Sequence, residues 1–86
     1  MLFETAVEGV LAALEGKLDL PGSELREELQ KTTAAMGNFG RMAELPSLVQ
    51  LCESISGYLW PVPLEQVSAL AQAALALWRD RKPWCC

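Results

Sequence analysis

Apolar residues recur every three or four positions along most of the chain, and this spacing is the strongest constraint on its fold. The first segment shows steps of four, three and four between Phe3, Val7, Val10 and Leu14. Such steps place side chains on one face of an α-helix. No segment shows the two-residue alternation of β-branched residues that a half-buried strand requires. The pattern therefore predicts an all-α fold.

Proline and glycine divide the chain into four predicted helices, at about residues 2–16, 23–39, 45–59 and 63–81. Ser23 is the predicted N-cap of the second helix, and Pro46 and Pro63 suit the first turns of the third and fourth. Gly37 and Gly40 mark either the end of the second helix or a close backbone approach, and we expect the helix to end there. Short connections favour antiparallel neighbours, so residues 1–86 are predicted to form one up-down-up-down four-helix bundle.

The predicted core-facing positions follow the apolar stripe of each helix. For the second helix they are Leu25, Leu29, Thr32, Met36 and Phe39. For the third and fourth they are Leu45, Leu48 or Val49, Cys52, Ile55, Leu59, Leu64, Val67, Leu70 or Ala71, Ala74, and Leu77 or Trp78. Trp78 is expected in the core, whereas Trp60 and Trp84 fit either a core or a surface position.

The sequence contains no histidine, which removes histidine general bases, phosphohistidine and histidine-ligated metals. The paired acids Glu27 and Glu28 fall on a predicted exposed face, without the apolar pocket that separates the pKa values of a catalytic pair. The stretch from Gly37 to Gly40 lacks the Gly-Lys-Ser/Thr ending of a phosphate-binding loop. We therefore expect a chain that is not an enzyme and that holds no metal and no cofactor.

The formal net charge of −4 and the pI near 4.6 argue against a nucleic-acid-binding surface. Arg79, Arg81 and Lys82 form a local exception. We interpret them as a solvated helix end that complements the helix dipole, and an acidic or membrane partner is the alternative.

Three cysteines without metal-ligand or redox spacing indicate a reducing compartment. Cys52 lies on an apolar stripe and is predicted to pack in the core. Cys85 and Cys86 resemble a double-cysteine prenylation signal, and a lipid anchor there is one open alternative. No apolar run reaches the length of a membrane span, and the segment 1–4 lacks the basic start of a signal peptide. We expect a cytoplasmic chain.

Residues 27–40, followed by Leu45-Pro46-Ser47-Leu48 and an acidic Glu53, resemble the histidine phosphotransfer (HPt) domain of CheA-type chemotaxis kinases. The likeness is greatest to the degenerate HPt-like segments of cyanobacterial motility and phototaxis kinases. In that family a histidine is followed by small residues, by a glycine ten places on, and by a Leu-x-x-Leu helix. The likeness covers about 25 residues well.

Aligning Gly40 with the family's glycine places Gln30 at the position of the phosphorylated histidine and Ala34 at the small position. A register two residues earlier instead places Glu28 there and matches Lys31 to the family's lysine. Neither register supplies an imidazole, and the amide nitrogen of a glutamine is not nucleophilic because its lone pair is delocalised into the carbonyl.

The resemblance thus implies a non-catalytic HPt-like module of a two-component, chemotaxis-type histidine kinase, acting as a protein-interaction or spacer domain. Its partner-binding residues would be Gln30, Lys31, Ala34 and Gly37, and its partner a response-regulator receiver domain or a neighbouring kinase domain. Alternatively, Ala34 and Gly37 are helix-packing contacts and Gln30 is plain surface.

A second hypothesis is a stand-alone helical adaptor that homodimerises through an apolar, tryptophan-containing surface. The mean hydropathy of +0.17 and the three tryptophans favour it.

Overall fold

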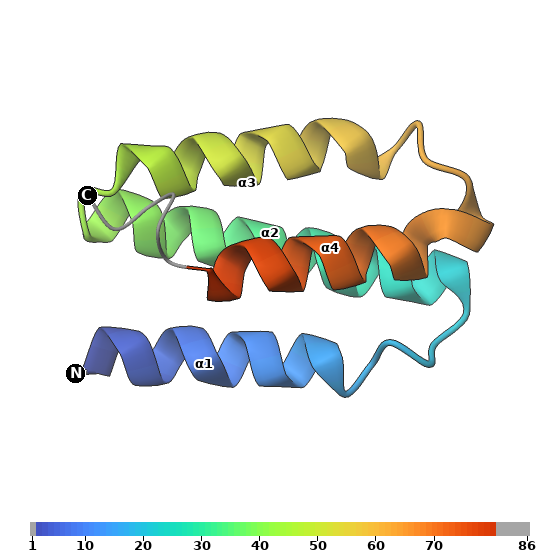
Figure 1. Cartoon of the computed structure of the whole chain (residues 1–86), viewed down its shortest axis with the longest axis horizontal. Coiled ribbons are helices and arrows are strands. Elements are labelled where there is room, and N and C mark those ends of the chain that lie inside the picture. The colour runs from blue at the N-terminus through green and yellow to red at the C-terminus, as the bar shows by residue number, and fades with distance from the viewer. Residues whose placement is uncertain (1, 81–86) are drawn as a thin grey trace.

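Residues 2–80 are described by the computed structural model shown in Figure 1. The α-helices are α1 (Leu2–Glu15), α2 (Gly22–Met42), α3 (Pro46–Leu59) and α4 (Val67–Arg79), and a short 3-10 turn, η1 (Leu64–Gln66), precedes α4. No strand is present between residues 2 and 80. The predicted all-α class with four helices is therefore confirmed.

The four helices lie along the long axis of the molecule, and the turns that join them lie alternately at its two ends (Figure 1). The molecule measures 34 × 22 × 18 Å. Helix α2 contacts each of the other helices, and its contact with α3 is the most extensive. Helix α2 is thus the central element of the bundle. Its main packing partner is α3.

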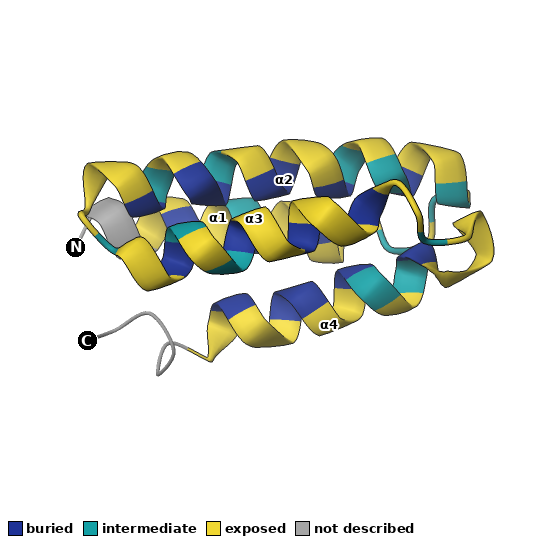
Figure 2. Cartoon of the chain, turned by 90° about the horizontal axis from the view of Figure 1, so that it is seen from above, coloured by how far each residue is buried: buried dark blue, intermediate teal, exposed yellow. Residues whose placement is uncertain are grey.

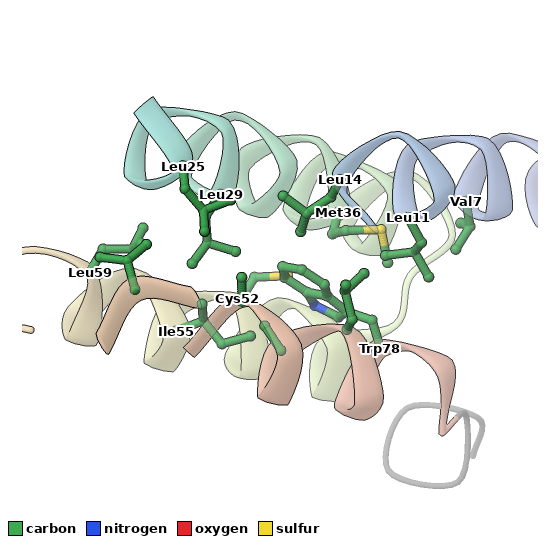
Figure 3. Close-up of a cluster of buried hydrophobic side chains, with 14 of the residues drawn as sticks. Val7, Leu11, Leu14, Leu25, Leu29, Met36, Cys52, Ile55, Leu59 and Trp78 are labelled. Carbon is green, nitrogen blue, oxygen red and sulfur yellow. The ribbon is translucent and has the colours of Figure 1, made fainter. Parts of the chain in front are cut away.

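One cluster of buried side chains holds the helices together, as the inward blue stripes in Figure 2 show. The buried residues repeat at helical spacing because each helix has a single apolar face. Figure 3 shows Trp78 inside this cluster. Its fully buried large side chains are Val7, Leu11, Leu14, Leu25, Leu29, Met36, Leu48, Leu59, Val67 and Trp78.

The second helix differs from its prediction at both ends. Pro21 occupies the N-cap position without a side-chain capping bond, and Ser23 lies inside the helix, so the predicted serine cap is wrong. The helix also continues through Gly37 and Gly40 to Met42, three residues beyond the expected end. Both glycines are buried, and Gly40 marks a close backbone approach to α3, the alternative that the sequence left open.

The fourth helix begins later than predicted, because residues 64–66 form a 3-10 turn before the α-helix starts at Val67. At its other end Arg79 forms two hydrogen bonds with the Glu15 carboxylate, each 3.0 Å long. These hydrogen bonds, with the charge of Arg79, lower the pKa of Glu15, so the pair is ionised at neutral pH. Arg79 thus links α4 to α1.

The remaining C-terminal predictions, for Arg81, Lys82, Trp84, Cys85 and Cys86, lie outside the described residues. Among residues 2–80, no helix has both the length and the apolar character needed to cross a membrane.

Candidate functional site

Gly40 of α2 lets the backbone of that helix approach α3 closely, and Gly37 lies in ordinary contact with α3. A Cβ atom at Gly40 would lie 2.9 Å from Cγ2 of Val49 and 3.3 Å from Cγ of Leu48. One turn earlier, a Cβ at Gly37 would lie 3.8 Å from Cβ of Cys52. Since only glycine fits the tighter of these contacts, the sequence of α2 sets how near the two helices lie.

A groove of about 280 Å³ lies above this contact, open to solvent between α2 and α3. Its walls come from both helices, so it is a feature of their packing and not of either helix alone. The lining residues are Gln30, Thr33, Ala34, Gly37, Asn38 and Arg41 from α2, and Val49, Cys52, Glu53 and Ser56 from α3.

Three of the four predicted site residues meet at this groove. Gln30 and Ala34 are exposed at its rim, and Gly37 is buried where the helices touch. Lys31 is outside the groove; its side chain is highly exposed, and its Nζ lies 3.8 Å from Oε2 of Glu28. Gln30, Ala34 and Gly37 therefore share one surface, which Lys31 does not join.

Glu28, the residue at the acceptor position in the other alignment, forms an ion pair with Lys17. Its Oε1 accepts a hydrogen bond of 2.9 Å from Nζ of Lys17, and this bond is the main reason why the pKa of Glu28 is lowered. Glu28 is thus a paired carboxylate between α2 and the α1–α2 connection. It does not line the groove, in which Gln30 stands.

The groove also contains polar residues that the sequence interpretation did not select. Arg41 donates a hydrogen bond of 3.2 Å from Nη1 to Oδ1 of Asn38 on the same helix. Glu53 and Ser56 face the groove from α3. The helical spacing from Gln30 through Ala34 to Asn38 and Arg41 was a usable signal for the α2 residues. The α3 residues had no such signal, because their placement depends on which helix packs against α2.

The floor of the groove offers no reactive group. The hydroxyl of Thr33 donates to the backbone oxygen of Leu29 at 2.7 Å. Burial raises the pKa of the Cys52 thiol, and the adjacent indole of Trp78 and the charge of Arg41 offset this only in part. The thiol is therefore protonated at neutral pH and is a poor nucleophile.

The groove is consequently suited to binding and not to covalent chemistry. The rim presents an amide at Gln30, a guanidinium at Arg41 and a carboxylate at Glu53, all exposed. Through residues 2–80 no three His, Cys, Asp or Glu side chains come together as a metal site. The small side chain of the exposed Ala34 leaves room for a partner to approach the backbone of α2, whereas Gly37 is covered by α3.

A second surface feature lies at the opposite end of α3 from its proline. Three large apolar side chains in and beside the α3–α4 connection, Tyr58, Trp60 and Leu64, are exposed by 64%, 61% and 49%. The indole of Trp60 lies under the guanidinium of Arg26, with Cζ 5.5 Å from the ring centroid.

Comparisons with protein-family models, with curated proteins and with solved structures give no match to this chain.

Proposed function

We propose that the chain is a non-catalytic HPt-like module, an up-down-up-down four-helix bundle of a cytoplasmic chemotaxis-type histidine kinase system. In this proposal it binds a response-regulator receiver domain through the α2–α3 groove. Gln30 stands where the phosphorylated histidine of an HPt domain would stand. The module then contributes docking or spacing, and the phosphate chemistry belongs to other domains.

One observation carries the proposal: Gln30, Ala34 and Gly37 line the same solvent-open groove. The sequence resemblance alone points to these three residues and to Lys31, and only Lys31 lies outside the groove. In an HPt-like domain the acceptor position must be exposed on a helix face, and Gln30 is exposed. The small, exposed Ala34 one turn further along α2 leaves space for a partner helix.

Substitution of Ala34 by arginine tests the docking surface. The expected result is a receiver-domain affinity at least tenfold weaker, because the long side chain fills the groove where the partner would approach. The measurement is an amide NMR titration of the isotope-labelled chain with receiver domains of the source organism. With the wild-type chain, shifts should cluster at Gln30, Ala34, Gly37 and Asn38.

Ala73→Arg is the matched control, because Ala73 is also an exposed alanine inside a helix but lies on α4. It should bind with the wild-type affinity. Shifts that avoid α2, or equal affinities for the two variants, would remove the docking claim.

The exposed apolar side chains near the α3–α4 connection favour a second candidate function, a helical adaptor that homodimerises. Tyr58, Trp60 and Leu64 would be buried against a second copy of the chain in this case. A sedimentation-equilibrium mass that stays monomeric over a hundredfold range of concentration would exclude this adaptor.

A further inference from the structure

The α3–α4 connection, residues 60–66, packs against the start of α2 but buries little of its own surface. Trp60, Pro61, Pro63 and the residues of η1 are exposed, and Val62 is half-buried against the core. Pro61 and Pro63 have no backbone N–H. The amide of Val62, which bonds to the Tyr58 oxygen at 3.2 Å, is one of the few backbone bonds available to hold the segment.

Arg26 supplies the principal side-chain contacts between α2 and this connection. Its Nη2 donates a hydrogen bond to the backbone oxygen of Val62. The same guanidinium covers the indole ring of Trp60, an arrangement in which the cation is attracted to the ring. One side chain thus holds the connection at two points.

The closed arrangement has one unfavourable feature and one close backbone contact. Nε of Arg26 is buried without a hydrogen-bond partner, and burying a donor unsatisfied opposes closure. Gly22, one turn before Arg26, is packed so tightly that a Cβ atom there would overlap the backbone oxygen of Leu64. Closure therefore depends on the Arg26 contacts and on the absence of a side chain at position 22.

We propose that residues 60–66 are a strap, closed over one end of the core by Arg26, which opens locally while the four helices stay folded. Val62 of the closed strap packs against the core, and Leu25 and Leu59 lie toward one end of that core (Figure 3). Segments with few buried contacts and few backbone hydrogen bonds open at lower free energy than the helices they join. Opening exposes Val62 and the apolar surface that it covers.

Amide hydrogen exchange of the full chain, followed by NMR, tests the strap. Arg26→Met keeps an extended apolar stem but removes the hydrogen bond and the cation. We expect the amides of Val62 and Gln66 to exchange at least tenfold faster in this variant, and amides in the middle of α1 and α2 to change less than twofold.

A second variant disturbs the same segment through its contact with Gly22. Gly22→Ala leaves Arg26 in place but adds a Cβ against Leu64, so it should accelerate the same two amides. Arg41→Met is the matched control, because Arg41 is an exposed arginine of α2 that bonds to Asn38. It should leave the exchange of Val62 and Gln66 unchanged.

Two results would overturn the proposal. Exchange of Val62 within twofold of the wild-type rate in Arg26→Met would show that Arg26 does not hold the strap closed. Acceleration that is equal at Val62 and in the middle of α1 would show that the segment opens only when the whole chain unfolds.

Discussion

Replacing Trp78 by alanine is expected to cost about 3–5 kcal/mol of unfolding free energy, the largest loss for any single substitution considered. Trp78 is fully buried and is the largest side chain of the core. Its removal leaves a cavity that the surrounding leucines cannot fill without moving whole helices. Because a domain is stabilised by only about 5–15 kcal/mol in total, this loss brings the chain near to unfolding.

Two further substitutions show whether the loss of stability comes from the buried position or from removing any tryptophan. Trp78→Phe should cost clearly less than alanine, since phenylalanine keeps a large apolar ring in the buried position and leaves a smaller cavity. Trp60→Ala should cost less than about 1 kcal/mol, because Trp60 is exposed and loses mainly its contact with Arg26. Urea unfolding followed by far-ultraviolet circular dichroism measures all three. A larger loss at Trp60 than at Trp78 would contradict the described core.

Gly40→Leu is expected to destabilise the chain by about 2–3 kcal/mol, because the new side chain has no space between α2 and α3. Even a Cβ atom would lie 2.9 Å from Val49 Cγ2 and 3.3 Å from the backbone nitrogen of Val49. The clash outweighs the gain of about 0.5–1 kcal/mol that leucine brings over glycine inside a helix.

The matched control is Gly9→Leu on α1, where nothing lies within 4 Å of an added Cβ. Helix propensity then acts alone, and this variant should be more stable than the wild type by about 0.5–1 kcal/mol. The same unfolding experiment compares the two variants. Equal effects of the two substitutions would mean that Gly40 is not a packing contact between the helices.

The helical stripes were predictable because each element has one clear apolar face. Leu25, Leu29, Thr32 and Met36 are all buried, as their spacing indicated. The fourth helix had two candidates for its last inward position, and packing places Trp78 inside and leaves Leu77 42% exposed. Local periodicity thus determines which face turns inward, while the choice between adjacent residues depends on the partner helices.

The end of α2 was not predictable from local preferences. Gly37 and Gly40 each disfavour a helix by about 1 kcal/mol relative to alanine, so a helix end there was the simpler expectation. Contact with α3 outweighs this cost, and that contact is invisible in the sequence of α2 alone. For the same reason the sequence pointed to Gln30, Ala34 and Gly37 as binding residues but did not point to Ser56, which comes from the opposite helix.

The contacts of Arg26 with the α3–α4 connection could not be predicted from the sequence either. Arg26 and Val62 are 36 residues apart in the chain, and an arginine in the first turns of a helix has no feature that marks it as a link to a distant carbonyl. Likewise, Glu15 and Arg79 are 64 residues apart. Side-chain links of this length follow from the arrangement of the helices and not from any motif.

The central claim is that the exposed Gln30 occupies the acceptor position of an HPt-like docking face that has lost its imidazole. The most direct test is phosphoryl transfer to Gln30→His from a receiver domain phosphorylated on its aspartate. In this step the phosphoryl group leaves the aspartate carboxylate and bonds to an imidazole nitrogen. Glu28→His is the matched control, since it restores an imidazole in the other alignment, outside the groove.

The account predicts an acid-labile, base-stable phosphate on Gln30→His, detected by intact mass and by radiolabel, with none on the wild-type chain or on Glu28→His. An unlabelled Gln30→His chain, or a label on Glu28→His alone, would contradict the assignment of Gln30 to the acceptor position.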